Sequence, residues 1–345
     1  MLDVQNTQTR LKRISKVFAD IRPHLFLLAA LAVLMVVMSL VAPNFLTKGN
    51  MMDILRVNSI KGIMSIGMTL VLLTGGIDLS VGSVFAFSGA VAASFVMGSY
   101  SDYPTSQFLK MPVLVAVLVA LVAGGLLGMV NGVVVTKLKV EPFIATLAMM
   151  TFARGLTYLY TGGFPINFKP MPEVFAWFGK GYVVGLPTPT FLFIIVTLVM
   201  MYVLKYTAFG RSLYAIGGNR ETARLSGLKV ERNIALVYTI MGVLSGLAGV
   251  IMTSRVAAAA ASAGESYEMD VIASVVLGGT LQSGGKGTIL GTVIGIFIFG
   301  VIENGMNILG MPTYYKLLIK GIVIIVALGY RIVGAGQKSK RRTAA

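Results

Sequence analysis

The chain has 345 residues, of which 56% are hydrophobic and only 12% are charged. Soluble domains use roughly 45–50% apolar and 25% charged residues, so this composition excludes an ordinary water-soluble fold. The formal charge of +16 gathers in short stretches between apolar runs, which argues against a nucleic-acid-binding surface.

Uncharged apolar runs of about 20 residues, the length at which a helix crosses a bilayer, recur along the sequence. They are too long and too uniform for the alternating segments of an outer-membrane barrel. The sequence therefore predicts an all-α, polytopic integral membrane protein with about ten transmembrane helices, organised as one domain over residues 1–345. The predicted spans are residues 25–45, 59–75, 80–98, 112–136, 143–161, 188–205, 233–253, 268–281, 288–304 and 313–330.

Basic residues indicate which side of the membrane the loops occupy. Residues 1–24 hold five Lys and Arg, 205–232 hold six and 331–345 hold five. Because cytoplasmic loops carry an excess of Lys and Arg, we expect a cytoplasmic N-terminal tail, a cytoplasmic loop over 206–232 and a cytoplasmic C-terminal tail over 332–345. The first apolar run is too long for a signal peptide and is predicted to be retained as the first span.

The first polar interruption is the stretch GGIDLSVG at residues 75–82. A similar stretch, GGTLQSGG at 278–285, follows and precedes apolar runs in the same way, which favours an internal repeat of two broken helices. The residues shared by the two stretches are Gly75, Gly76, Ser80 and Gly82 in the first copy and Gly278, Gly279, Ser283 and Gly285 in the second.

Asp78 lies inside the first of these breaks, where a carboxylate needs a partner. One interpretation is contact with a polar solute or an ion. The other, which we favour, is a cap on a helix that begins near Leu79, because a Gly-Gly pair just before Asp suits a helix start. Further along the chain, Glu303 and Lys320 are a candidate ion pair. Glycines spaced four apart are predicted to let helices pack closely.

The second break, GGTLQSGGKGT at 278–288, is not a nucleotide-binding loop. The pattern G-x-x-x-x-G-K-[ST] would need a glycine at Thr280 and a hydroxyl residue at Gly287. The chain also has no cysteine and one histidine. We therefore expect neither ATP hydrolysis on this chain, nor a metal site, nor a bound cofactor.

The loop over residues 207–230 is the longest basic segment between spans. Asn219 is predicted to cap a short helix over 220–226, which Gly227 ends. A basic helix at the membrane surface binds either anionic lipid or a protein partner. The apolar residues Ala223, Leu225 and Leu228 favour a protein partner.

Four runs resemble the ribose-type permeases of bacterial ABC sugar importers, over about residues 40–330. They are SIGMTLVLLTGGIDLSVGSVFAFSGAVAAS (65–94), PFIATLAMMTFARGLTYLYTGG (142–163), GRSLYAIGGNRETARLSGLKV (210–230) and YEMDVIASVVLGGTLQSGGKGTILGTVIG (267–295). The sequence departs from the family pattern at Leu281 and Gln282, where small and apolar residues are expected.

This resemblance implies a permease subunit in the bacterial inner membrane, paired with a second copy or a close relative. Its partners would be a periplasmic sugar-binding protein and a cytoplasmic ATPase subunit with two nucleotide-binding halves. The stretch 217–228 is similar to the loop through which such permeases contact the ATPase. Its candidate coupling residues are Gly217, Gly218, Asn219, Glu221, Thr222, Ala223, Leu225 and Gly227.

The expected function is ATP-driven import of a monosaccharide, ribose or another pentose. A neutral sugar needs few charged groups along its path, in agreement with the composition. The alternative is an ion-coupled sugar transporter that works without an ATPase, for which Asp78 and Glu303 are the candidate carboxylates. A non-transporting membrane scaffold is a third class, and it predicts no solute flux.

Overall fold

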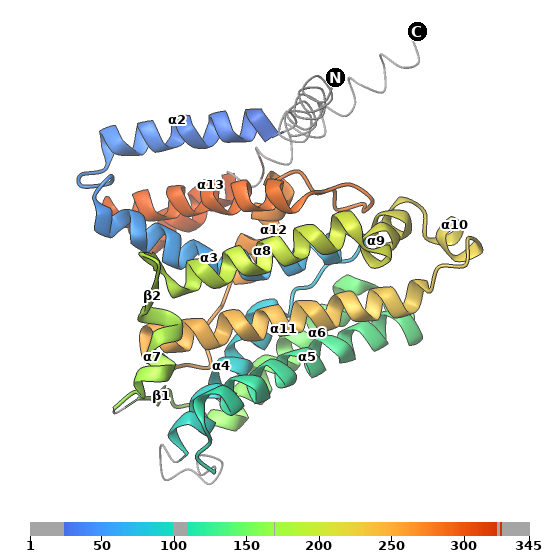
Figure 1. The fold of residues 1–345 in the computed structure, drawn as a ribbon, viewed down its shortest axis with the longest axis horizontal. Helices are drawn as coiled ribbons and strands as arrows, with labels where there is room; N and C mark the ends of the chain where they lie inside the picture. The colour runs from blue at the N-terminus through green and yellow to red at the C-terminus, as the bar shows by residue number, and fades with distance from the viewer. Residues whose placement is uncertain (1–23, 99–108, 169, 323–324, 326–345) are drawn as a thin grey trace, which may run out of the picture.

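The computed structural model describes residues 24–98, 109–168, 170–322 and 325 (Figure 1). Most of these residues are helical. The helices are α2 (Leu25–Val41), α3 (Lys48–Leu73), α4 (Val81–Met97), α5 (Val113–Lys137), α6 (Pro142–Thr161), α7 (Glu173–Lys180), α8 (Thr188–Tyr206), α9 (Ala208–Gly218), α10 (Arg220–Leu225), α11 (Val230–Val256), α12 (Tyr267–Leu277) and α13 (Ile289–Ile308). The strands are β1 (Ile166–Asn167), β2 (Tyr182–Val183), β3 (Leu186–Pro187) and β4 (Ala258–Ala259).

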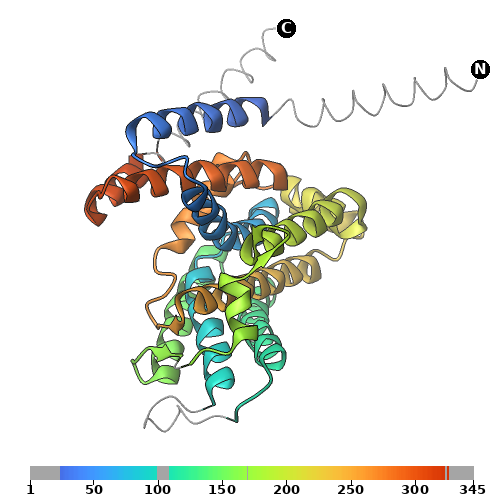
Figure 2. The same ribbon diagram turned by 60° about the vertical axis from the view of Figure 1, so that its left-hand side comes forward.

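The long helices lie side by side in a layered bundle. In Figure 1, α2 forms one edge, α13 lies beneath it, and α3, α8 and α11 follow, with α4, α5 and α6 at the opposite edge. Figure 2 shows the same stacking of α2 on α13 from another side. Helix α11 packs against α3, α4 and α5 and carries much of the main apolar core.

Local sequence signals set several helix ends. The Thr47 and Thr288 side chains accept hydrogen bonds from Asn50 N and Gly291 N, which satisfies backbone donors at the starts of α3 and α13. Helix α6 begins with Pro142 and ends at Gly162, which adopts the left-handed conformation that favours glycine.

Closely spaced glycines bring α5 and α11 into direct contact, as the sequence predicts. A Cβ atom at Gly128 would collide with the carbonyl oxygen of Tyr238 and lie 3.1 Å from the Cα of Gly242. At Gly242, a Cβ atom would in turn collide with the carbonyl oxygen of Gly124. These backbones therefore approach more closely than any larger residue permits.

The number of membrane spans is not confirmed at ten. Among the described residues, five helices are long and apolar enough to cross a membrane, namely α3, α5, α8, α11 and α13, and α2 and α4 are shorter apolar helices. Helix α12 has 11 residues, or about 16 Å at 1.5 Å per residue, against a hydrocarbon core of about 30 Å. The predicted span over 268–281 is therefore about half of a crossing, because the second glycine break interrupts it.

Short elements occupy the end of the bundle opposite α9 and α10 (Figure 1). The stretch 162–187 contains α7 and the antiparallel pair β2–β3. Strand β1 from this stretch pairs with β4, so Ile166 lies opposite Ala259. This pairing joins the 162–187 stretch to the segment that follows α11.

Several predicted features lie wholly or partly outside the described residues. These are the N-terminal tail apart from His24, and the C-terminal tail. The last predicted span, 313–330, is helical over 313–322, and most of its remainder is not described.

We predict that Gly128→Val destabilises the protein by about 1–3 kcal/mol, the usual cost of overpacking, because its side chain would push α5 from α11. The matched control is Gly155→Val in α6, since a Cβ atom there meets nothing within 4 Å. Thermal unfolding of both variants in detergent measures the difference. Equal stability of the two variants would contradict this account of the contact.

Candidate coupling and transport sites

The two glycine breaks meet at one end of the bundle. The Gly285 backbone N–H donates to the carbonyl oxygen of Leu73, the last residue of α3, at 2.9 Å. Gly75 has a left-handed φ of 76°, and a Cβ atom there would lie 3.6 Å from the Ser283 carbonyl oxygen. The breaks are therefore packed backbone against backbone, although they lie far apart in the sequence.

The end of α9 completes this contact, which we call the glycine junction and define as Leu73, Gly75, Gly217, Gly284 and Gly285. A Cβ atom at Gly217 would collide with both the Leu73 carbonyl oxygen and the Gly285 nitrogen. Gly284 has a φ of 85°, and a Cβ atom there would lie 2.9 Å from the Gly217 Cα. Of the predicted site residues, the structure thus gathers part of both breaks and the start of the proposed coupling stretch.

The remaining residues of the breaks lie apart from this junction. Gly82 packs in the first turn of α4, where a Cβ atom would collide with the Gly264 carbonyl oxygen. Gly278, which follows α12, packs closely against Gly291 of α13. These glycines therefore set helix contacts within the bundle. A Cβ atom at Gly76 would lie 2.6 Å from the Tyr238 hydroxyl oxygen. Gly279 adopts a positive φ of 113°.

Asp78 is buried, with 2% exposure, and accepts two hydrogen bonds from Ser80. Its Oδ1 atom lies 2.9 Å from the Ser80 nitrogen and 2.6 Å from the Ser80 hydroxyl group. Helix α4 begins at Val81 with Ser80 as its N-cap, close to the predicted start near Leu79, so Ser80 rather than Asp78 is the N-cap residue. Asp78 orders the residue that precedes the helix, since a short polar side chain readily bonds to the backbone two residues on.

The coupling stretch forms the short helix α10, as predicted. Asn219 Oδ1 accepts a hydrogen bond from Thr222 N at 2.8 Å. At the other end, Gly227 has a φ of 82°, and the bonds Gly227 N to Arg224 O and Leu228 N to Ala223 O close a Schellman motif. The helix is thus capped at both ends by local sequence.

The faces of α10 differ in exposure. Ala223 is buried at 3% exposure, whereas Leu225 is 82% exposed. Arg224 bonds to Glu221 at 3.0 Å and to Glu231 at 2.5 Å, which ties α10 to the start of α11. An exposed leucine on a short, fixed helix is a surface suited to a protein partner.

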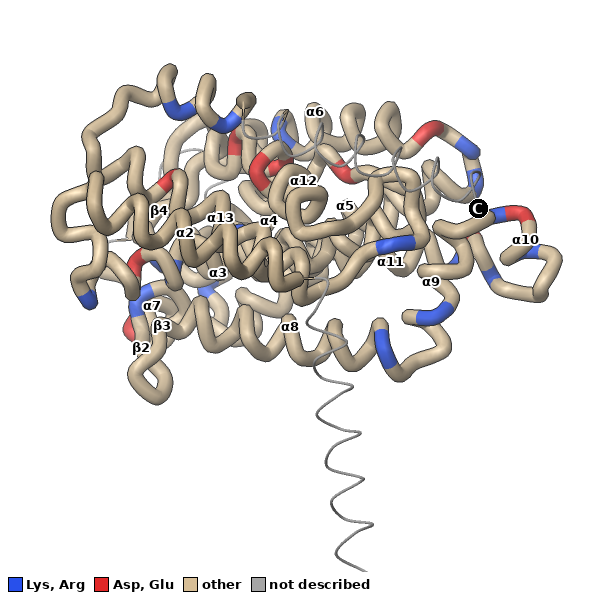
Figure 3. Tube along the Cα trace, turned by 90° about the horizontal axis from the view of Figure 1, so that it is seen from above, with Lys and Arg blue, Asp and Glu red and all other residues tan. Residues whose placement is uncertain are grey.

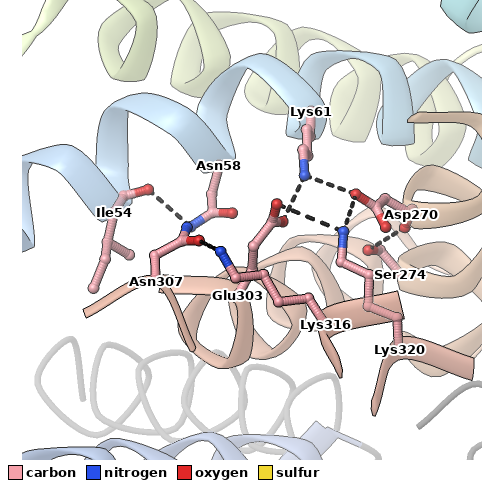
Figure 4. A network of polar contacts seen from close by, with 9 residues as sticks. All are labelled: Ile54, Asn58, Lys61, Asp270, Ser274, Glu303, Asn307, Lys316 and Lys320. Carbon is pink, nitrogen blue, oxygen red and sulfur yellow. Dashed lines mark hydrogen bonds and ion pairs between the residues drawn. The ribbon is translucent and has the colours of Figure 1, made fainter. Parts of the chain in front are cut away.

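Four charged side chains form a cluster inside the bundle, which we call the charge quartet: Lys61, Asp270, Glu303 and Lys320 (Figure 4). Lys61 Nζ lies 2.7 Å from Asp270 Oδ2 and 2.6 Å from Glu303 Oε2. Lys320 Nζ lies 3.0 Å from Asp270 Oδ2 and 3.5 Å from Glu303 Oε1. Each lysine therefore contacts both carboxylates, and the formal charges cancel.

The predicted ion pair between Glu303 and Lys320 is confirmed, but it has the longest distance in the quartet. Lys61 was missed, although it lies inside a predicted span, where a lone lysine is itself a signal of a site. Its ammonium group also lies 4.9 Å from the centroid of the Tyr267 ring, a cation–π distance. The quartet connects α3, α12, α13 and the helical residues 313–322.

The segment between β4 and α12 is held by Arg154 of α6. The Arg154 guanidinium donates to the carbonyl oxygens of Ala261 and Ala263, the latter at 2.8 Å. The pairing of β4 with β1 holds the start of the same segment. An alanine-rich stretch with a high helix propensity is thus kept non-helical by contacts from distant parts of the chain.

Comparison with known proteins gives the family. Residues 50–328 match the family described as branched-chain amino acid transport system / permease component. The chain belongs to this permease family.

Three relatives are similar over most of the chain. The ribose import permease protein of Escherichia coli strain K12 is 46% identical over 303 residues, which is 87% of this chain and 91% of the relative. The ribose import permease protein of Bacillus subtilis strain 168 is 44% identical over 327 residues, 95% of this chain and 98% of the relative. The L-arabinose ABC transporter permease protein of Azospirillum brasilense is 34% identical over 296 residues, 86% of this chain and 84% of the relative.

Membership in the family defines the class of activity. The chain is a permease subunit of an ABC importer and a multi-pass inner-membrane protein, not an enzyme. An importer of this class works with an ATPase and a substrate-binding protein. The resemblance drawn from the four sequence motifs is thereby confirmed.

We predict that Lys61→Met destabilises the protein by about 3–5 kcal/mol, the usual cost of breaking a buried ion pair by removing one partner. Two carboxylates would then share the single lysine Lys320. The control is Lys316→Met, because Lys316 bonds to the Asn307 side chain and has no ion pair among the described residues. Thermal unfolding in detergent measures both variants.

A double-mutant cycle tests whether this cost arises from the pair itself. The loss in Lys61→Met combined with Asp270→Asn should be smaller than the sum of the two single losses. Additive losses, or equal losses in Lys61→Met and Lys316→Met, would show that the quartet does not act as a unit.

Proposed function

We propose that this chain imports ribose or another pentose across the inner membrane, as the membrane-spanning subunit of its importer. The observation that carries the proposal is the 44–46% identity to ribose import permeases over most of the chain. ATP hydrolysis takes place on a separate subunit with two nucleotide-binding halves. A periplasmic sugar-binding protein delivers the sugar, and a second permease subunit, identical or closely related, completes the pathway.

The orientation in the membrane follows from the distribution of charge. Lys and Arg gather around α9 and α10 and the adjacent ends of the neighbouring helices (Figure 3). The proposal puts this end in the cytoplasm, together with residues 1–24 and 332–345. The opposite end, with α7 and the short strands, then faces the binding protein. The whole chain acts as a single permease domain.

The ATPase contact is proposed at α10 within residues 206–232. Leu225 supplies an exposed apolar side chain on a helix that is capped at both ends. Because α9 ends in the glycine junction, a displacement of α9 and α10 acts on both breaks. Transport requires two packed arrangements with different access to the solute, and the breaks at 75–82 and 278–285 are the proposed joints between them.

The ion-coupled alternative has less support from the charges. Glu303, one of its two candidate carboxylates, contacts two lysines in the quartet. Asp78, the other, is hydrogen-bonded to Ser80. A coupling ion at Glu303 would therefore have to replace the contacts with the two lysines.

Reconstitution in proteoliposomes tests the proposal. We expect ribose uptake only when the ATPase, ATP and the sugar-loaded binding protein are all present. Uptake by the chain alone under a proton or sodium gradient would replace this proposal with the ion-coupled one. If the complete system takes up no pentose, the proposed substrate class is wrong.

We predict that Leu225→Asp lowers ATP-dependent uptake at least about tenfold, because a carboxylate would disrupt an apolar contact worth about 1.4 kcal/mol or more. The matched control is Val184→Asp, since Val184 is 95% exposed in the turn between β2 and β3, at the other end of the bundle. Co-purification of the ATPase with each variant gives a direct measurement. Retention of the ATPase by Leu225→Asp would place the contact elsewhere.

A further inference from the structure

A cavity of about 260 Å³ lies inside the bundle, between α4, α11 and the segment that joins β4 to α12. It lies away from the glycine junction, since β4 pairs with β1 at the opposite end of the molecule. Its volume falls just below the roughly 300–1,000 Å³ of sites for drug-sized ligands, and so suits a smaller solute.

Two aromatic side chains form one wall of this cavity. Phe85 of α4 and Tyr267 of α12 both line it, with ring centroids 5.4 Å apart and planes tilted by 59°. The apolar faces of a sugar ring, which carry its C–H groups, pack well on aromatic rings. The Tyr267 ring also makes a cation–π contact with Lys61 of the charge quartet, whose ammonium group lies 4.9 Å from the ring centroid.

The opposite wall is made of small residues and backbone. Ala258, Ala259, Ala260, Ala263 and Gly264 line the cavity, and their short side chains leave room for a solute. Although the carbonyl oxygens of Ala260 and Gly264 already accept hydrogen bonds from Ala263 N and Tyr267 N, each carbonyl oxygen has a second lone pair that can accept from a sugar hydroxyl. Arg154 holds the segment in place through two of its carbonyl oxygens.

Side-chain hydroxyls add a small number of polar groups. Thr253 and Tyr267 line the cavity, and neither hydroxyl has a hydrogen-bond partner in the part of the chain that the structure describes. Thr239, on the same helix as Thr253, shows the usual alternative, since its hydroxyl donates to the Ala235 carbonyl oxygen at 2.9 Å. The Thr253 hydroxyl is therefore available for a ligand.

From these observations, and on the basis of the proposed function, we propose that this cavity is a transient binding site for the transported monosaccharide. The Phe85–Tyr267 wall stacks on the sugar ring, and Thr253 and the carbonyls of 258–264 bond to its hydroxyls. A mostly apolar lining with few polar groups binds weakly, as passage requires, because a solute on a transport path has to leave as well as enter.

The absence of cysteine from the chain permits a direct test of occupancy. The Ala260→Cys variant places a thiol in the lining, and Ser262→Cys places one two residues away at an exposed position that does not line the cavity. We expect ribose at about 100 mM, a concentration well above a Kd of about 1 mM, to slow maleimide labelling of the first variant at least about threefold. Labelling of the second should not change.

Uptake by the complete reconstituted importer gives a second measurement. Thr253→Val keeps the side-chain shape and removes the hydroxyl, and Thr239→Val is the matched control on the same helix. We expect Thr253→Val to lower ribose uptake about two- to tenfold, the effect of one neutral hydrogen bond, with unchanged thermal stability. Thr239→Val should transport at the rate of the unmodified protein.

The outcomes separate this inference from the function on which it rests. If the complete importer carries ribose but ribose protects neither thiol and the two threonine variants transport equally, the cavity is not a sugar site. Protection by ribose of both thiols alike also overturns the proposal, because it reports a general conformational change. If the complete importer carries no pentose, the proposed function itself fails.

Discussion

Lys61 lies inside the bundle at 4% exposure, so the protein itself has to balance the charge of its ammonium group. The carboxylates of Asp270 in α12 and Glu303 in α13 both contact Lys61. Because two carboxylates carry one negative charge more than Lys61 balances, Lys320 supplies the second positive charge. Because an unpaired charge in an apolar environment is costly, these contacts fix the positions of α3, α12 and α13 relative to one another. The other features of the molecule are built around this fixed group of helices.

Helix α12 connects this group to both ends of the bundle. Its first turn carries Tyr267 and Asp270, next to the cavity and the quartet. Its last residue leads into the second glycine break, which contacts the end of α3 and the end of α9. Helix α12 is thus held by charged side chains at one end and by the glycine junction at the other.

Glycine has two different roles in this structure. Between α5 and α11 it removes side-chain volume, so that long helices pack at close distance in a medium where apolar burial gives little drive for helix association. At the junction, Gly75, Gly284 and Gly285 adopt positive φ values that other residues rarely take. The first role is rigid packing, and the second lets the chain turn sharply within a crowded contact.

The sequence by itself determined the class of the protein and many of its local features. Long apolar runs require helices in a membrane, because a backbone in lipid has to satisfy its own hydrogen bonds. The caps of α10 at Asn219 and Gly227 follow from signals a few residues long, and the structure has them where they were predicted.

Only the tertiary structure decided which of these local features meet. Lys61 and Asp270 are 209 residues apart, and Gly217 contacts both the end of α3 at Leu73 and the second break. No local pattern encodes such pairings, which depend on how helices stack. The same reason explains why the alanine-rich segment after β4 is not a helix, since Arg154 and strand β1 hold it. Propensity sets what a segment prefers, and contacts with distant residues set what it adopts.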